Sequence, residues 1–254
     1  MKTRNRKSDR PDESRRHLLK LLAAGSGLLV FPLGSLPTRA SAADGTGERP
    51  PYWAYAVDTT RCMGCCACMR ACRDENGVPK GVFRTWVERY RIDLDDEVHV
   101  DVAMHDDFVF APAPGDVARA FFVPKLCNHC EKSVCNQVCP VGAAYRTADG
   151  VVLVDAEHCI GCGYCVQACP YGSRFINPES HVADKCTFCY HRLARGLAPA
   201  CVLTCPREAR LFGDLNDPQS KLSVLLRQRP YRLLKPELGT HPKCYYLGLD
   251  REVV

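Results

Sequence analysis

Cysteine spacing is the feature that most constrains this chain. Of its 18 cysteines, sixteen fall into four groups of four, and groups I and III follow the pattern C-x2-C-x2-C-x3-C without deviation. Group II lengthens the middle gap to four residues, group IV lengthens it to eleven, and a proline follows the last cysteine of groups II, III and IV. The members are Cys62, Cys65, Cys68 and Cys72 in group I; Cys127, Cys130, Cys135 and Cys139 in group II; Cys159, Cys162, Cys165 and Cys169 in group III; and Cys186, Cys189, Cys201 and Cys205 in group IV.

This spacing suits cubane iron–sulfur clusters. Three thiolates on one tight loop reach three corners of a 4Fe-4S cluster, whereas the last cysteine of the C-x3-C pair points away and ligates a different cluster. Gly161 and Gly163 allow the loop of group III to approach inorganic sulfide, and its exposed N–H groups donate hydrogen bonds to cluster sulfurs. Sixteen ligands at four per cluster predict four 4Fe-4S clusters.

Other uses of the thiols explain the pattern less well. Zinc sites use paired C-x2-C motifs, which leaves the third cysteine and the C-x3-C ending unexplained. A disulfide framework does not need repeating triplets. A dehydratase or radical enzyme needs an iron with an open position, and hence a group short of one cysteine, whereas all four groups are complete. A structural scaffold stabilised by zinc remains the alternative to an iron–sulfur protein.

Two cysteines lie outside the groups. Cys66 competes with Cys65 for a ligand position, but only Cys65 keeps the spacing of group III. We therefore do not include Cys66 among the expected cluster ligands. We expect Cys244 to be a small buried apolar residue. Three histidines flank the groups, and each is either a hydrogen-bond donor to a cluster or a solvated loop residue: His129, His158 and His191.

Residues 1–42 resemble a twin-arginine export signal, in which a phenylalanine stands at the position of Leu18. Arg15 and Arg16 precede a weakly apolar run that glycine and proline interrupt, and a small-residue site for signal peptidase ends at Ala42. The run is too short and too broken for a membrane span, which requires roughly 20 residues. We therefore expect cleavage after Ala42 and a periplasmic mature protein without a membrane span. The resemblance also implies that the cofactor is inserted in the cytoplasm, before export.

The net charge of +5 belongs to this leader. Residues 1–42 contain nine Lys or Arg and three Asp or Glu, so the rest of the chain keeps 25 of the 34 basic residues and 26 of the 29 acidic ones. The mature chain is therefore almost neutral, with no excess of basic residues to attract nucleic acid. We expect no nucleic-acid partner.

Short regular elements separate the groups. Residues 52–57 predict a strand before group I, and residues 144–154 predict a hairpin with an Asp-Gly turn before group III. Strand, cluster loop and short helix then repeat, as in each half of a ferredoxin. Because only a compact hairpin separates groups II and III, we expect them to form one inner unit, with groups I and IV forming an outer unit around it. The predicted fold class is α+β, with two nested ferredoxin-like units.

The domain boundaries follow from this nesting. The outer unit has a β-rich insertion, with β-forming residues at 83–92 and 120–123. We expect the end of the chain to be an extended, partner-binding tail in which a helix begins near Leu222. The expected segments are 1–42 (signal peptide), 43–126 (first half of the outer unit, with the insertion), 127–170 (inner unit), 171–214 (second half of the outer unit) and 215–254 (C-terminal tail).

These motifs are similar to those of the four-cluster, ferredoxin-type iron–sulfur subunits of molybdopterin oxidoreductases, the family of dimethyl sulfoxide, polysulfide and tetrathionate reductases. The resemblance covers the chain from Tyr52 to Asp214 and rests on the segments CMGCCACMRAC, LCNHCEKSVCNQVCPVGA, CIGCGYCVQACPYGSRFINPES and ADKCTFCYHRLARGLAPACVLTCP. The last two segments, with GDLNDPQS and GTHPKCYYLGLD, are most similar to the tetrathionate and polysulfide branch. Ser133 and Val134 stand where the family often has a pair of prolines, which alters a loop and no ligand.

The resemblance implies a non-catalytic electron-transfer subunit. Family members carry no substrate site and relay electrons between a quinone-interacting integral membrane subunit and a molybdopterin catalytic subunit. The expected complex reduces tetrathionate, thiosulfate or polysulfide; nitrite-reductase, hydrogenase and sulfite-oxidising complexes are the alternatives. The resemblance also implies that the cluster of Cys62 lies nearest the catalytic subunit and the cluster of Cys159 nearest the membrane.

The ligand sets follow from exchange of the last cysteine within each ferredoxin unit. The family resemblance implies the same nesting of the units. The predicted sets are Cys62, Cys65, Cys68 and Cys205 for cluster 1; Cys186, Cys189, Cys201 and Cys72 for cluster 2; Cys127, Cys130, Cys135 and Cys169 for cluster 3; and Cys159, Cys162, Cys165 and Cys139 for cluster 4.

Overall fold

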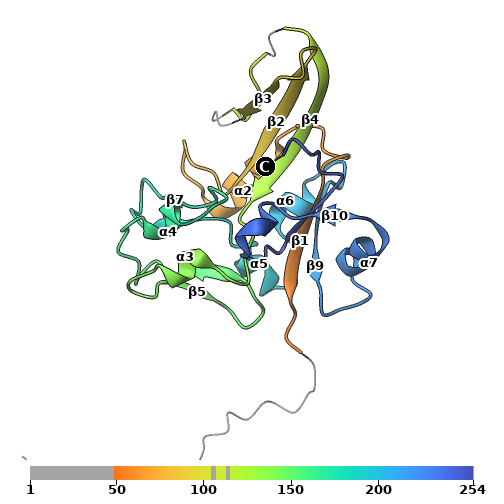
Figure 1. The fold of residues 1–254 in the computed structure, drawn as a ribbon. Helices are drawn as coiled ribbons and strands as arrows, with labels where there is room; N and C mark the ends of the chain where they lie inside the picture. The colour runs from red at the N-terminus through yellow and green to blue at the C-terminus, as the bar shows by residue number, and fades with distance from the viewer. Residues whose placement is uncertain (1–48, 104–106, 113–114, 254) are drawn as a thin grey trace, which may run out of the picture. The chain divides into compact units, whose positions relative to one another are not determined.

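The computed structural model describes residues 49–103, 107–112 and 115–253, so the expected export signal lies outside the described residues. These residues belong to one unit, Glu48–Val254, which consists of short helices and small sheets (Figure 1). This mixture agrees with the expected α+β class. In this part of the chain, no helix combines the length and the apolarity that crossing a membrane requires.

A four-stranded sheet contains β10 (Tyr231–Arg232), β11 (Cys244–Leu247), β1 (Trp53–Asp58) and β9 (Arg210–Asp214), in that order. β1 is the strand expected before group I, and its side chains alternate between two cores. Tyr55 and Val57 face the core that holds the buried cysteines, whereas Ala54 and Ala56 pack with Leu222 of α7 (Lys221–Gln228). The sheet is therefore covered on both faces, and one face looks onto the cysteine sites.

The C-terminal segment is part of this sheet, which corrects the expectation of an extended tail. β11 lies parallel to β1, with Tyr55 paired to Cys244 and Asp58 paired to Leu247. Tyr246 and Leu247 are fully buried. The expected helix is α7; it begins after Ser220, whose Oγ accepts a hydrogen bond from Ser223 N at 3.1 Å. The apolar residues of the segment thus complete the core of the unit.

The β-rich insertion forms a three-stranded antiparallel sheet, in the order β3 (Val98–Val102), β2 (Thr85–Asp93), β4 (Val117–Leu126). In Figure 1 its far end projects from the rest of the unit. Tyr90 and Phe121 are paired across β2 and β4, and their rings stack with centroids 5.1 Å apart. β4 ends directly before Cys127, so the base of this sheet lies beside the cysteine groups.

Two small hairpins and five short helices carry the groups. β5 (Ala144–Arg146) and β6 (Val152–Val154) pair as the predicted hairpin, with Gly150 at a φ of 80° in its turn. β7 (Phe175–Ile176) and β8 (Ala183–Asp184) form a second hairpin before group IV. The helices that hold or flank cysteines are α2 (Ala67–Asn76), α3 (Val134–Gln137), α4 (Tyr164–Gln167), α5 (Tyr190–Leu193) and α6 (Ala200–Leu203); a 3-10 turn, η1 (Pro236–Leu238), precedes β11.

Candidate iron–sulfur sites

The first cysteine of each group begins the same kind of turn. In groups II and IV the backbone N–H two residues later points to the first thiol, with 3.5 Å between His129 N and Cys127 Sγ and 3.4 Å between Phe188 N and Cys186 Sγ. Such N–H groups stabilise thiolates and donate to cluster sulfurs. The residue at this position has a positive φ in all four groups: Gly64 (71°), His129 (43°), Gly161 (67°) and Phe188 (55°).

Close packing requires glycine at one of these turns. A Cβ on Gly161 would lie 2.3 Å from the carbonyl oxygen of His181, which is a backbone atom with little freedom to move. Gly163, in contrast, has open space at the position of a Cβ. Gly161 is therefore needed where the chain approaches β8, at whose start Ala183 N donates to Cys159 Sγ at 3.4 Å.

Thiols from two distant groups meet in a first cavity. α2 of group I packs against α6 of group IV, and Cys205, which follows α6, accepts a hydrogen bond at Sγ from Ala209 N at 3.2 Å. Group I supplies three of the predicted ligands in the lining and group IV supplies one. The cysteines that line the cavity are Cys62, Cys65, Cys68 and Cys205, together with the surplus Cys66.

The remaining thiols of groups I and IV line a second cavity. Group IV supplies three of them and group I supplies one. Tyr55 lines this cavity from β1, and its Oη lies 3.2 Å from Cys201 Sγ. The cysteines in the lining are Cys72, Cys186, Cys189 and Cys201.

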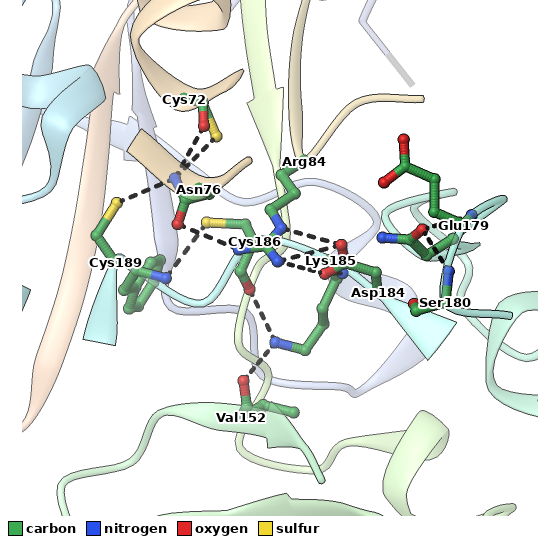
Figure 2. Close-up of polar contacts among 12 residues, drawn as sticks. Cys72, Asn76, Arg84, Val152, Glu179, Ser180, Asp184, Lys185, Cys186 and Cys189 are labelled. Carbon is green, nitrogen blue, oxygen red and sulfur yellow. Dashed lines mark hydrogen bonds and ion pairs between the residues drawn. The ribbon is translucent and has the colours of Figure 1, made fainter. Parts of the chain in front are cut away.

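The side-chain amide of Asn76 is aimed at two thiols of the second cavity (Figure 2). Its Nδ2 lies 3.6 Å from Cys72 Sγ and 3.7 Å from Cys189 Sγ. Arg84 fixes this orientation, because its Nη1 donates to Asn76 Oδ1 at 3.1 Å while its Nη2 pairs with Asp184 at 3.0 Å. The amide nitrogen therefore faces the two sulfurs and also donates to the carbonyl oxygen of Cys72 at 3.0 Å.

A third cavity combines groups II and III. It is also lined by Arg174, by His129 and by Thr240, which precedes β11. Group II supplies three thiols and group III supplies one. The cysteines in the lining are Cys127, Cys130, Cys135 and Cys169.

The remaining predicted set lies closer to solvent. α3 and α4, which carry groups II and III, pack against each other, and Cys139 directly follows the last turn of α3. Burial raises the pKa of Cys139, but the backbone N–H groups that surround it, including that of Ala144, outweigh this effect and the net shift is downward. Cys159 and Cys139 are half-buried, Cys165 is buried and Cys162 is exposed.

Burial favours the protonated form of several other thiols in the predicted sets. It raises the pKa of Cys68 to about 11 and that of Cys130 to about 12. Because a thiol must lose its proton to bind metal, cluster binding at these positions releases protons. A buried thiol set of this kind gains its negative charge only together with the metal.

The two surplus cysteines are buried thiols, and burial raises the pKa of each to about 12. Cys66 caps α2 at a φ of 55°, in the position that Gly163 holds before α4, and its Sγ donates to Gly64 O at 3.4 Å. Cys244 is fully buried in β11, as expected. Neither residue has the partly exposed, electropositive surroundings of a reactive cysteine.

The three flanking histidines differ. His129 is fully buried, its Nδ1 accepts a hydrogen bond from Val152 N at 3.0 Å, and its ring stacks on Phe188. Burial, aided by nearby Lys185, holds its pKa well below the usual value, so the ring is neutral. His158 and His191 instead pair with Asp155 and Glu75 on the surface.

Buried cations lie near the thiols, and the sequence analysis did not predict them. Among the described residues they are Arg174 (4% exposed), Lys185 (1%), Arg210 (2%) and Lys243 (1%), which directly precedes Cys244. Lys185 Nζ donates to the carbonyl oxygens of Cys186, at 2.8 Å, and of Val152 (Figure 2). A local signal exists for the arginines: each is the last residue of C-P-x3-R, after Cys169 in group III and after Cys205 in group IV.

Thiols on short loops, with backbone N–H donors and buried cations beside them, define an iron–sulfur protein. The donor set fits such clusters, because positive charges and N–H groups balance the negative charge of thiolate-bound iron and sulfide. Comparison with known proteins supports this class: residues 118–215 match the family described as a 4Fe-4S dicluster domain.

Known relatives define the family. The chain is 41% identical over 244 residues to a tetrathionate reductase subunit of Salmonella typhimurium, and the match covers 94% of this chain and 90% of the relative. It is 44% identical over 190 residues to protein NrfC of Escherichia coli (74% and 77%) and 38% identical over 197 residues to a polysulfide reductase chain of Wolinella succinogenes (76% and 93%). This chain therefore belongs to the iron–sulfur electron-transfer subunits of the dimethyl sulfoxide, polysulfide and tetrathionate reductase family, as its motifs indicated.

Proposed function

We propose that this chain holds four 4Fe-4S clusters and relays electrons between a quinone-interacting integral membrane subunit and a molybdopterin catalytic subunit. It transforms no substrate itself. The lining of the three cavities carries this proposal: each combines three thiols of one group with one thiol of another. This exchange is the arrangement of a two-cluster ferredoxin, and it occurs between groups I and IV and between groups II and III. This exchange of thiols between groups supports two nested ferredoxin-like units.

The proposed ligand sets are those that the spacing predicts. The cavity linings support the first three sets, and the packing of α3 against α4 supports the fourth. The sets are Cys62, Cys65, Cys68 and Cys205; Cys72, Cys186, Cys189 and Cys201; Cys127, Cys130, Cys135 and Cys169; and Cys139, Cys159, Cys162 and Cys165.

The two ends of this relay are the loops of groups I and III. Both loops expose a thiol, at Cys65 and Cys162. Apolar side chains beside these thiols are open to solvent, with Met63 57%, Ile160 65% and Tyr164 57% exposed. Exposed apolar side chains around a site are typical of surfaces that contact a partner subunit. Together with the family resemblance, they support a Cys62 end at the catalytic subunit and a Cys159 end at the membrane subunit.

The complex that best fits the chain reduces tetrathionate or a related sulfur compound. Similarity to the tetrathionate reductase subunit extends over 94% of the chain, and the polysulfide reductase chain is also similar. Both enzyme names refer to sulfur compounds with S–S bonds. The substrate itself would bind to the catalytic subunit.

Metal analysis tests the cluster count. Anaerobically purified protein is expected to contain about sixteen iron and about sixteen acid-labile sulfide per chain, and to show a broad visible absorbance that dithionite bleaches. Iron near eight per fully folded chain would contradict four clusters. A colourless zinc protein would favour the scaffold alternative.

We further propose that residues 1–42 direct export of the loaded protein to the periplasm. Arg15→Lys with Arg16→Lys is expected to retain the precursor in the cytoplasm with its clusters intact, because both arginines belong to the recognised motif. Fractionation with iron analysis measures this, and N-terminal sequencing checks cleavage after Ala42. Undiminished export of the double variant would show that another route operates.

A further inference from the structure

Among the residues that the structure describes, two arginines are buried without a carboxylate partner. Arg210 is 2% exposed and Arg174 is 4% exposed. Within the part of the chain that the structure describes, neither guanidinium forms an ion pair with an Asp or Glu. Because an unpaired buried charge is costly, each position implies a negative group nearby.

Arg210 lies between the first and second cavities. It lines the cavity of Cys62. Its Nη1 donates to Tyr55 Oη at 3.4 Å and its Nη2 donates to Thr85 Oγ1 at 2.9 Å, and both acceptor residues line the cavity of Cys72. Tyr55 in turn contacts Cys201 Sγ. One positive charge is therefore shared by the thiols of groups I and IV.

Arg174 has the corresponding position between groups II and III. It lines the third cavity, and among the described residues none of its three guanidinium nitrogens has a hydrogen-bond partner of normal geometry. Thiols lie close enough to act on it: burial lowers its pKa, but Cys135, Cys127 and Cys165 outweigh burial and raise it. Cys165 belongs to the fourth ligand set. The guanidinium thus lies in the third cavity, and thiols of both sets act on it.

The two arginines are equivalent in sequence as well as in place. Each ends the motif C-P-x3-R, as CPYGSR in group III and as CPREAR in group IV. Groups I and II lack an arginine at this position, where Gly77 and Ala144 stand. Each proposed ferredoxin-like unit therefore has one such arginine, and it comes from the second group of the unit.

We propose that Arg210 and Arg174 set the reduction potentials of this protein, each acting on both clusters of its own unit. This inference rests on the four-cluster function proposed above. A cluster gains one negative charge when it takes up one electron, and a permanently charged guanidinium in a buried site stabilises that reduced form. One charge that acts on two clusters raises both reduction potentials together. The difference between the two potentials therefore stays small, and so does the free energy of electron transfer between the clusters.

Neutral replacement in the full-length, cluster-loaded protein tests this inference. Arg174→Met is expected to lower the midpoint potentials of two of the four clusters, and Arg210→Met those of the other two. The expected change is about tenfold in each reduction equilibrium, which corresponds to about 59 mV for a one-electron couple. Redox titration followed by electron paramagnetic resonance measures this, and the two unaffected clusters serve as an internal reference in each variant.

Charge-preserving variants separate an electrostatic role from a structural one. Arg174→Lys and Arg210→Lys are expected to keep potentials nearer to wild type than the Met variants do. Unchanged potentials in fully loaded Met variants, or shifts of equal size in the Lys variants, would overturn the inference and leave the proposed function intact. If the Met variants lose iron, Arg→Gln replaces them. Loss of iron from the Gln variants too, with the Lys variants fully loaded, would show that the charge is needed to retain the clusters and would overturn the assigned role in setting potentials. A wild-type protein with fewer than four clusters would overturn both proposals.

Discussion

Asn76 is placed to act on the proposed cluster of Cys72 without being a ligand. Its amide nitrogen faces Cys72 and Cys189, and Arg84, anchored by Asp184, prevents the amide from turning (Figure 2). Hydrogen bonds to cluster sulfur favour the reduced form, as a nearby positive charge does. Unlike the buried arginines, Asn76 contacts the thiols of one set only.

Asn76→Leu is therefore expected to lower the midpoint potential of a single cluster, the one that we assign to Cys72, Cys186, Cys189 and Cys201. Leucine has a similar size but donates no hydrogen bond. Redox titration with electron paramagnetic resonance measures the shift. Asn216→Leu, at an exposed position away from the thiols, is the matched control and should leave all potentials unchanged. A shift of several clusters, or of none, would contradict the assigned role.

At the scale of elements, β11 links the end of the chain to the sites. It pairs in parallel with β1, whose Tyr55 reaches Cys201 in the second cavity. The loop before β11 also reaches the third cavity through Thr240, whose Oγ1 lies 2.5 Å from Tyr171 Oη. The last strand of the chain therefore supports both proposed units.

Leu247→Ala in β11 is expected to destabilise the folded protein by about 2–5 kcal/mol, because it removes a fully buried side chain and leaves a cavity beside α7. Loss of visible absorbance in guanidinium should be faster than in wild type. Leu238→Ala, at a side chain that is 49% exposed, is the control and should change stability by less than about 0.5 kcal/mol. Equal behaviour of the two variants would mean that β11 is dispensable for the core.

At the scale of the whole molecule, we expect folding to depend on the metal. The main core includes the thiols of Cys68, Cys127 and Cys186, and cations, among them Arg174 and Arg210, are buried beside such thiols. Without clusters, the cations would lack the negative charge that balances their burial, which costs several kcal/mol for each ion.

The metal-free chain is therefore expected to be largely unfolded. Circular dichroism and NMR of protein prepared without iron measure this, and anaerobic reconstitution with iron and sulfide should restore the folded state. A well-dispersed NMR spectrum in the absence of metal would contradict the prediction.

Local sequence was enough to establish the chemistry of this protein and the form of its cluster loops. A turn of this kind involves contacts between residues only a few positions apart, so the spacing from Cys159 to Cys169 was sufficient to predict a ligand loop there, whereas the contact of Gly161 with the carbonyl oxygen of His181 was not predicted. The same holds for the 144–154 hairpin, whose Asp-Gly turn is a short-range signal. Three features emerged only from the folded chain: the parallel pairing of β11 with β1, the aim of Asn76, and the burial of Arg174 and Arg210 between groups of thiols. Those features join residues that lie far apart in the chain, and no local periodicity or motif specifies which distant segment will cover a strand or a charge.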